Sequence, residues 1–352
     1  MQPAGTFNMS YSQDMAIVRT RFQWGAFIGF LIFSFTLPLY AGDYWLGLIN
    51  IIAITIIAVL GLNILTGYCG QISIGHSAFV AIGAYTAAIL ADHLGFSAWA
   101  ALPCSILAAS LIGLIFGLPA LRVKGFYLAM TTLGGWFIIS WLIPHGDNLG
   151  IPTGGVYGLA VARPTLGNIV INTETEFFYL IMVFTLVAVF LAKNLTRTRI
   201  GRAFVAIRDN DLAAEVLGIN LSYHKLLAFF IACAFAGVAG WLKVYYLGYA
   251  HMDHYPLMDS IWWLGMLIVG GLGSTMGAIY GTAFLMLLWE GAAVLSPEIG
   301  KAFPGVALQI FASSTQILIG LVIALFIVFE PRGINHRWQI FKSYYRLWPF
   351  SH

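Results

Sequence analysis

The sequence predicts an all-α integral membrane protein: a polytopic helical bundle of about eight to ten transmembrane helices with broken or re-entrant glycine-rich segments. Hydrophobic residues make up 60% of the 352 positions and charged residues only 9%, whereas about 25% of the residues of a soluble domain are charged. The apolar runs are long and do not alternate with polar residues as strands do. Because lipid offers the backbone no hydrogen bonds, such runs must form helices.

Eight apolar segments approach the length of about 20 residues that a membrane-spanning helix needs. They cover residues 23–40, 44–65, 76–92, 97–119, 126–145, 177–193, 226–247 and 307–328. The first segment ends without the small-residue cleavage pattern of a signal peptide, so we expect it to remain as a helix. Cys69, Cys104 and Cys233 are isolated within apolar runs. They are expected to be small core residues rather than disulfide or metal ligands.

A further apolar stretch, residues 260–290, is too long for one crossing and is interrupted by glycines. The positive-inside rule decides how often it crosses. Arg19 and Arg21 put the N-terminus in the cytoplasm, and the basic C-terminal tail joins it there only if 260–290 crosses an even number of times. We therefore predict two helices that meet at the glycine cluster, with a re-entrant hairpin as the alternative.

This topology divides the chain into a cytoplasmic N-terminal segment (1–22), a transmembrane domain (23–330) and a basic cytoplasmic tail (331–352). Residues 194–225 form the longest cytoplasmic loop. Most of the basic residues then lie in the cytoplasm, as the positive-inside rule requires. Lys243, Asp259 and Glu290 are expected on the outer side, with Glu290 near a helix end.

Two glycine-rich segments interrupt the predicted helices, one after the second helix and one within 260–290. The candidate packing and break glycines are Gly70, Gly75, Gly271, Gly273, Gly277 and Gly281. The last three recur every fourth residue, which leaves a groove on one helix face where a second helix can approach closely. This approach is either static packing or a mobile helix contact.

Exposing the polar side chains of the first interruption to lipid would cost free energy. Gln71, Ser73 and His76 are therefore expected to face protein or a water-filled path. His76 is either a proton relay or a hydrogen-bonded packing residue. No second ionisable residue lies at helical spacing from it, which disfavours a proton-coupled carrier.

Several chemical signatures are missing from the sequence. It contains no Gly-x-x-x-x-Gly-Lys-Ser/Thr loop for ATP phosphates, no His-Glu-x-x-His metal motif and no Gly-x-Ser-x-Gly motif. An enzyme is therefore not supported, and neither a bound metal nor a bound cofactor is expected. The basic residues are spread over several loops at a net charge of +3, so no nucleic-acid partner is expected.

The loop 194–225 contains its own ordered segment. Good helix formers run from Asp209 to Leu217, with possible N-caps at Asp209 and Asn210 and a stop at Gly218. We predict a short amphipathic helix outside the membrane. Its apolar edge either docks into a groove on a soluble partner or lies on the membrane surface.

This loop resembles the cytoplasmic coupling segment of permeases in bacterial ABC importers. More specific resemblances occur in order at residues 61–79 (GLNILTGYCGQISIGHSAF), 121–133 (LRVKGFYLAMTTL), 152–155 (PTGG), 270–274 (GGLGS) and 330–333 (EPRG). Over about residues 44–335 the chain is similar to the high-affinity branched-chain amino-acid permeases of the LivM type. The resemblance implies that the residues coupling to the ATPase are Arg202, Arg208, Asp209, Ala213, Ala214, Glu215 and Gly218.

The same resemblance implies a multi-subunit importer in the bacterial inner membrane, with both termini of this chain in the cytoplasm. The implied partners are a sister permease, two cytoplasmic ATPases that use ATP and Mg²⁺, and a periplasmic solute-binding protein. The missing phosphate loop is then expected, since the partner subunits hydrolyse the ATP. Candidate residues of the translocation path are Gln71, Ser73, His76, Thr131, Thr132 and Thr153, each of which can instead contact only a neighbouring helix.

The implied substrates are branched-chain or related hydrophobic amino acids. Permeases for urea and short amides share most of these motifs, so they are the main alternative. The segment 133–146 is bulkier than in many relatives and lacks an acidic residue near its start. An ion-coupled secondary carrier and a membrane-embedded enzyme are the other classes considered.

Overall fold

The computed structural model describes residues 21–123, 125–166, 169–302 and 307–347. Its helices are α2 (Arg21–Thr36), α3 (Asp43–Leu62), α4 (His76–Leu94), α5 (Ala98–Gly117), α6 (Phe126–Leu142), α7 (Glu174–Leu195), α8 (Arg199–Asp209), α9 (Asp211–Val216), α10 (Leu221–Leu247), α11 (Leu257–Gly270), α12 (Thr275–Ala302), α13 (Ala307–Phe329) and α14 (Gly333–Leu347). Short 3-10 helices cover Leu37–Leu39, Leu118–Leu121, Gly146–Leu149 and Met252–His254. Two antiparallel two-stranded sheets pair β1 (Leu159–Ala160) with β4 (Tyr249–Ala250), and β2 (Thr165–Leu166) with β3 (Ile169–Val170).

The prediction of a polytopic all-α membrane protein is confirmed. Within the described residues, six helices are long and apolar enough to cross a membrane, and α13 and α14 form a bent pair that makes a seventh when counted as one span. The predicted total of eight to ten also included shorter helices. Among these, α2 has 16 residues, α6 has 17 and α11 has 14. Most of the predicted N-terminal segment and the last residues of the predicted tail lie outside the described residues.

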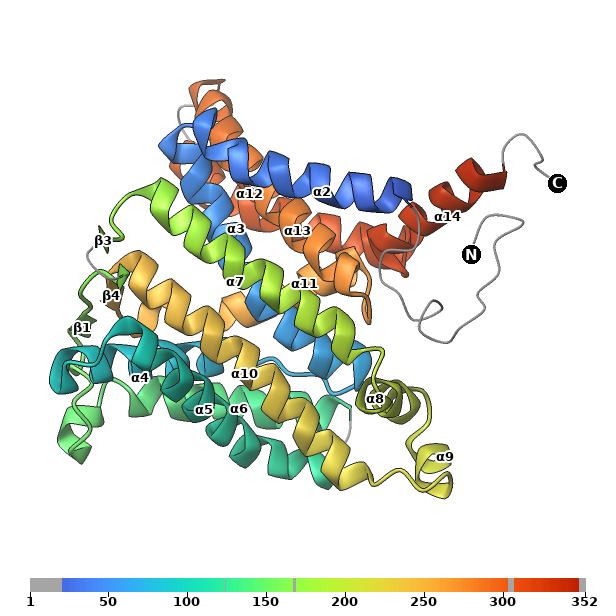
Figure 1. The fold of residues 1–352 in the computed structure, drawn as a ribbon, viewed down its shortest axis with the longest axis horizontal. Helices are drawn as coiled ribbons and strands as arrows, with labels where there is room; N and C mark the ends of the chain where they lie inside the picture. Colours follow the sequence, from blue (N-terminus) through green and yellow to red (C-terminus); the bar gives the residue numbers. More distant parts are fainter. Residues whose placement is uncertain (1–20, 124, 167–168, 303–306, 348–352) are drawn as a thin grey trace.

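Helix α10 is the centre of the bundle and packs against α3, α4 and α5 (Figure 1). Small residues allow these close contacts: a Cβ atom added to Gly83 would lie 2.7 Å from the Cα atom of Gly237. Trp241 is fully buried, and its indole N–H donates to the Ala98 carbonyl oxygen at 2.8 Å. In lipid, where apolar surface gives little drive for association, such close packing holds helices together.

The cysteines contribute to this packing and form no disulfide. All three are free thiols; Cys69 and Cys233 are buried, and Cys104 is partly buried. The Cys233 side chain fills the space beside Gly113, where a Cβ atom would lie 2.7 Å from the Cβ of Cys233. Cys69 and Cys233 therefore occupy the small core positions expected of them.

Both glycine-rich interruptions are visible in the structure. Helix α3 ends in a π-helical turn, Asn63–Tyr68, and the chain then runs without regular structure to the start of α4. The stretch 260–290 divides between α11 and α12 at residues 271–274. The second helix of this pair is longer than expected, which puts Glu290 well inside α12 rather than near a helix end.

The predicted loop 194–225 is mostly helical, and the prediction of a single short helix there was incomplete. Helix α8 was not predicted, α9 corresponds to the predicted helix, and α10 begins five residues earlier than expected. Side chains of Thr198, Asn210 and Asn220 accept hydrogen bonds from the first-turn N–H groups of α8, α9 and α10. Each cap satisfies a donor that would otherwise lack a partner, so three helices start within about 25 residues.

The α8–α9 segment and the β1–β4 sheet lie at opposite ends of the bundle, and α10 runs from one end to the other (Figure 1). Lys225 lies near the α9 end of α10, and Lys243 lies 18 residues further on. At about 1.5 Å per residue, these two positions are about 27 Å apart along the helix.

We predict that Gly281→Ala destabilises the protein because α12 contacts α11 through its backbone. A Cβ atom at Gly281 would overlap the Met266 carbonyl oxygen and lie 2.8 Å from the Cα of Gly270. Overpacking of this kind costs about 1–3 kcal/mol. Thermal unfolding of the purified variant should therefore occur at a lower temperature. Gly291→Ala on the same helix is the matched control, because no atom lies within 4 Å of its added Cβ; equal unfolding temperatures for both variants would contradict the close contact.

Candidate functional site

Five glycines bring three interrupted segments of the bundle together, and we call this region the glycine junction. Its members are Gly67 and Gly70 from the end of α3, Gly271 and Gly273 between α11 and α12, and Gly333 at the start of α14. A Cβ atom on Gly273 would lie 2.9 Å from the Gly67 carbonyl oxygen, and one on Gly333 would lie 2.7 Å from the Cα of Gly271. Four of the five have positive φ angles, between 72° and 112°, which side-chain-bearing residues rarely adopt.

Side chains at the end of α3 satisfy the backbone of the second interruption. The Asn63 Oδ1 atom accepts from the Gly273 N–H at 3.0 Å, and its Nδ2 donates to the Ser274 carbonyl oxygen at 3.1 Å. The Tyr68 and Thr275 hydroxyls lie 3.2 Å apart. Because buried backbone groups must find partners, these bonds allow the chain to leave the helical conformation at this depth.

Arg208, at the end of α8, connects the α8–α9 segment to the junction. Its Nη1 donates to the Gly67 carbonyl oxygen at 3.0 Å, while Nε and Nη2 donate to Asp209 Oδ1 at 2.9 and 2.8 Å. Its alkyl chain covers Gly70, where a Cβ atom would lie 2.9 Å from the Arg208 Cγ. The guanidinium group therefore forms a direct polar link between the end of α8 and the first interruption.

The remaining predicted coupling residues lie on or beside α8 and α9. Arg202 donates to the Arg197 carbonyl oxygen at 3.0 Å, the Ala213 N–H donates to Asn210 Oδ1, and Ala214 is buried. Gly218 ends the segment at φ +85°. Helix α9 and its C-cap Leu217 leave three apolar side chains strongly exposed: Leu212 (67%), Val216 (88%) and Leu217 (79%). The end of the bundle that carries α8 and α9 thus presents an apolar edge in a polar setting.

Four of the predicted path residues lie together near the first interruption. Gln71, Ser73, His76 and Thr132 are buried. The Ile74 N–H donates to the Thr132 hydroxyl oxygen at 3.0 Å, which joins the unwound segment to α6. The ring of His76 makes edge contacts with Phe79 and Trp263, with centroids 6.2 and 6.1 Å apart.

The other two path residues lie elsewhere. The Thr131 hydroxyl donates to the Leu128 carbonyl oxygen within α6. Thr153 lies in the turn after α6, where its hydroxyl donates to the Ile143 carbonyl oxygen at 2.7 Å and its N–H donates to Asp147 Oδ1 at 2.8 Å. The structure therefore brings four of the six residues together, and a role in translocation stays a prediction for all six.

A cavity of about 670 Å³ lies among α3, α4, α10, α11, α12 and α13. We call it the charged cavity, because Lys243, Asp259 and Glu290 line an otherwise largely apolar wall. Such a volume is within the range of small-molecule pockets, roughly 300–1,000 Å³. The sequence placed these three residues on the outer side and predicted no site there; Glu290 was expected near a helix end, where a carboxylate can reach the interface. The available signal was a lysine within the predicted helix 226–247, since an ionisable residue inside a span is a functional candidate.

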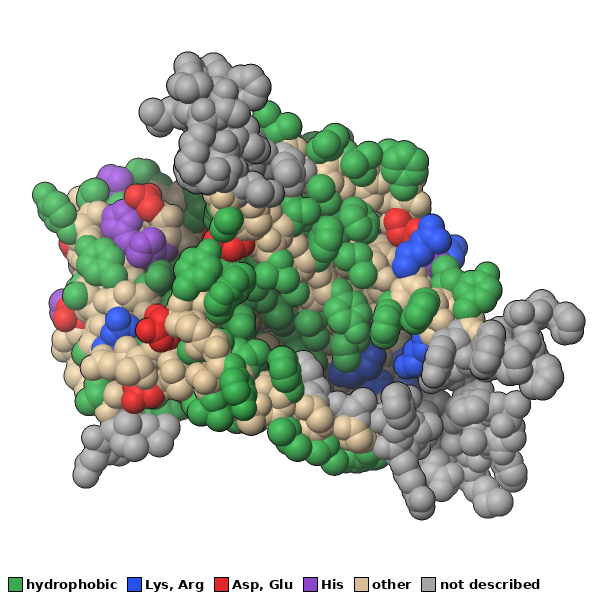
Figure 2. Space-filling model, turned by 90° about the horizontal axis from the view of Figure 1, so that it is seen from above, with side chains coloured by type: hydrophobic (Ala, Val, Ile, Leu, Met, Phe, Trp, Pro, Cys, Tyr) green, Lys and Arg blue, Asp and Glu red, His purple; other side chains and the backbone are tan. Residues whose placement is uncertain are grey.

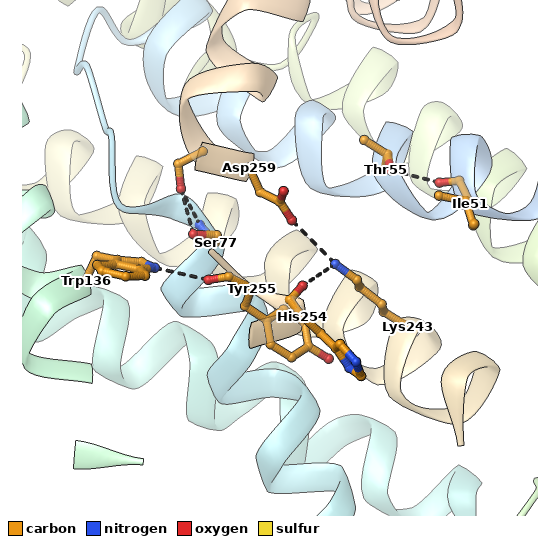
Figure 3. A network of polar contacts seen from close by, with 9 residues as sticks. Ile51, Thr55, Ser77, Trp136, Lys243, His254, Tyr255 and Asp259 are labelled. Atoms are coloured by element: carbon orange, nitrogen blue, oxygen red, sulfur yellow. Dashed lines mark hydrogen bonds and ion pairs between the residues drawn. The ribbon is translucent and has the colours of Figure 1, made fainter. Parts of the chain in front are cut away.

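The Lys243 ammonium group is held by the loop between α10 and α11 (Figure 3). Its Nζ donates to the His254 carbonyl oxygen at 2.6 Å, lies 3.5 Å from Asp259 Oδ2, and sits 4.8 Å from the centroid of the Tyr255 ring. Burial, and then the nearby Lys243 charge, lower the pKa of His254. This lowered pKa favours the neutral form of the His254 ring beside the Lys243 ammonium group.

Helices α4 and α6 fix the start of α11 beside this cluster. The Trp136 indole N–H donates to the Tyr255 carbonyl oxygen at 3.1 Å. The Ser77 N–H donates to the Ser260 hydroxyl oxygen at 2.8 Å, and the Ser260 hydroxyl donates in turn to that of Ser77 at 2.8 Å (Figure 3). Asp259 is thus attached to a segment that is anchored on both sides. Within the described residues, no group of three or more His, Cys, Asp or Glu side chains is arranged to hold a metal ion.

We predict that Arg208→Ala opens the glycine junction locally. The substitution removes the donor to Gly67 and the alkyl chain over Gly70, next to the buried Cys69. Cys69 should then react faster with a maleimide, as measured by mass spectrometry of the purified protein. Cys233, buried where α10 packs against α5, is the internal control and should stay unreactive. Unchanged labelling of Cys69 would mean that Arg208 does not hold the junction closed.

Comparison with known proteins assigns the family. The family described as branched-chain amino acid transport system / permease component matches residues 44–329. The high-affinity branched-chain amino acid transport system permease proteins LivM of Salmonella typhimurium and of Escherichia coli are each 29% identical over 315 residues, which covers 82% of this chain and 70% of theirs. The fructose import permease protein FruG of Bifidobacterium longum is 24% identical over 287 residues, 79% of this chain and 78% of its own. No solved structure matches the chain significantly. Since the family match covers most of the chain, this protein belongs to the permease family of branched-chain amino acid transport systems.

Proposed function

We propose that this chain is a permease subunit of an ATP-driven importer that moves branched-chain or related hydrophobic amino acids across the bacterial inner membrane. The family match and the two LivM relatives support the permease role and the substrate class. The importer mechanism is argued from the exposed apolar edge of α9. This helix follows α8, whose Arg208 is hydrogen-bonded to the glycine junction.

Helix α9 is the proposed docking element for a cytoplasmic ATPase. Its exposed Leu212, Val216 and Leu217 are the side chains that a groove on a soluble partner would bury. Movement of the docked ATPase would displace α8, and Arg208 would transmit this displacement to the glycine junction. A change in the angle between α11 and α12 would then open the translocation path to one side of the membrane and close it to the other, as in rigid-body gating.

The distribution of charge supports the proposed orientation. Figure 2 shows hydrophobic side chains over the middle of this face, most of its Lys and Arg side chains toward the right, and most of its Asp, Glu and His side chains toward the left. In Figure 1, which has the same horizontal axis, the α8–α9 segment lies toward the right and the β1–β4 sheet toward the left. The positive-inside rule makes the α8–α9 end cytoplasmic. The charged cavity then lies nearer the periplasm, where a solute-binding protein would deliver the substrate. A sister permease and two ATPases complete the proposed assembly; this chain would bind no cofactor, and ATP and Mg²⁺ would be used by the ATPases.

Urea or short amides are the alternative substrates. Small neutral amides need hydrogen bonds but no charged groups, whereas the charged cavity combines an apolar wall with one cation and two carboxylates. This composition favours an amino acid. Uptake of labelled leucine and labelled urea by the reconstituted importer would separate the two classes, and transport of urea alone would overturn the proposed substrate.

We predict that Leu217→Asp and Gly218→Arg each abolish ATP-driven leucine uptake while leaving membrane insertion intact. The first puts a charge on the exposed apolar edge, and the second puts a large side chain at a φ angle of +85° at the end of α9. Co-purification of the ATPase subunits with the permease should fall in parallel with uptake.

The control for this experiment is Tyr157→Ser. Tyr157 is 86% exposed and lies next to β1, at the opposite end of the bundle. Its variant should retain the ATPases. Normal uptake and normal ATPase retention in the Leu217 and Gly218 variants would count against α9 as the docking element. Leucine uptake by this chain without any ATPase, driven by an ion gradient, would instead establish a secondary carrier.

A further inference from the structure

We propose that the charged cavity is a binding site for an amino-acid zwitterion within the permease itself, with Lys243 binding the α-carboxylate and Asp259 binding the α-ammonium group. This inference rests on the proposed function and adds a substrate site to it. It assigns substrate recognition to residues outside the predicted translocation path.

The charges of the site match those of the ligand. Lys243 and Asp259 carry opposite charges 3.5 Å apart, and a zwitterion likewise carries a carboxylate and an ammonium group on adjacent atoms. Insertion of such a ligand between the two side chains gives each charge an opposite partner and leaves the net charge of the cavity unchanged. A ligand with only one charged group would leave one member of the pair poorly compensated in a low-dielectric setting, which is unfavourable.

The ion pair is open enough to admit a ligand. Charge-assisted N–H···O hydrogen bonds are usually about 2.7–2.9 Å long, so the separation of 3.5 Å is not a tight bond. The Lys243 and Asp259 side chains remain 25% and 31% accessible, and both line the cavity. Their accessible atoms therefore face the space that a ligand would occupy.

Lys243 does not depend on Asp259 for its position. The His254 carbonyl oxygen and the Tyr255 ring hold its ammonium group from the loop side. An ammonium group has three donors, so after its bond to the His254 carbonyl oxygen it can still donate to a carboxylate. The site is thus pre-organised for an anion before a ligand arrives.

The third charged residue of the cavity already has a partner. The Tyr44 hydroxyl donates to the Glu290 carboxylate across the space between α3 and α12. The Thr55 hydroxyl, also at the cavity wall, donates to the Ile51 carbonyl oxygen at 2.8 Å (Figure 3). These bonds leave Lys243 and Asp259 as the pair that a charged ligand can engage.

The remaining wall is suited to an aliphatic side chain. It is formed largely by Ile54, Ala58, Trp263, Met266, Met286 and Ile319. Methionine and aromatic side chains adapt to aliphatic groups of different shape. Leucine, isoleucine and valine would each bury their side chains here while their charged ends reach the ion pair.

Binding of tritiated L-leucine to the full-length chain in lipid nanodiscs, without other subunits, tests the site. Leucinamide lacks the carboxylate, and 4-methylpentanoate lacks the ammonium group. We expect each to compete at least about ten-fold less well than unlabelled leucine, because each leaves one buried charge without its partner. Equal competition by either analogue, or no leucine binding at all, would overturn the proposed site.

Two variants then test which residue binds the carboxylate of the ligand and which binds its ammonium group. Lys243→Gln should weaken leucine binding by about ten-fold or more but leave the binding of leucinamide nearly unchanged. Asp259→Asn should weaken leucine binding similarly and leave 4-methylpentanoate nearly unchanged. A merely structural role for the pair would weaken all ligands together, which would overturn the assignment. Asp253→Asn is the matched control, since its side chain is 89% exposed and lies outside the cavity lining.

Transport by the complete importer separates failure of the site from failure of the proposed function. Leucine import that is lost in both variants, with the ATPases still bound, supports the site. Leucine import that is unchanged in both variants overturns the site and leaves the proposed function standing. If the unmodified importer carries urea and no amino acid, both proposals fail.

Discussion

The need to satisfy backbone groups inside a membrane is the constraint on which the rest of this structure depends. Two helices are interrupted within the bundle, and each interruption exposes N–H and C=O groups that lipid cannot satisfy. The glycine junction meets this need in one place: the end of α3 supplies Asn63 to the second interruption, and α8 supplies Arg208 to the first. Glycines at these points remove the side chains that would keep the segments apart. The two interruptions therefore stabilise one another, and their stability also depends on the α8–α9 segment, which supplies Arg208.

The charged cavity follows from the second interruption. Because 260–290 divides at residues 271–274, α12 packs beside α11, and residues of both helices line the cavity together with Lys243 of α10. A single long helix over the same residues would not return through the bundle. The loop between α10 and α11 then supplies the His254 carbonyl and the Tyr255 ring that hold the lysine. One glycine cluster thus contributes to both proposed functional regions.

Much of this fold follows from the sequence because membrane helices are long and are marked by continuous apolar runs. The spans, the division of 260–290 and the helix at Asp209–Leu217 were all predictable. Helix α8 was not, because its sequence is rich in arginine, its start depends on the Thr198 cap, and its other end is held against the end of α3 by Arg208. The pairing of Lys243 with Asp259 was not predictable either, since it depends on how α10 and α11 pack, and the charge distribution of the sequence only assigned both residues to the outer side. Thr153 was predicted as a path residue from its motif, but it lies in a turn stabilised by Asp147, away from the other candidate path residues.

The unbroken course of α10 has a consequence for how the two ends of the protein communicate. Helix α10 has 27 residues without interruption and is packed against its neighbours through glycines and alanines, so it resists bending. Lys225, near α9, and Lys243, in the charged cavity, belong to the same rigid rod. A small tilt of this rod about its crossing with α4 would shift both ends at once, in opposite directions. In the proposed importer, α10 would then link events at the ATPase and at the substrate directly, in parallel with the route through Arg208 and the glycine junction.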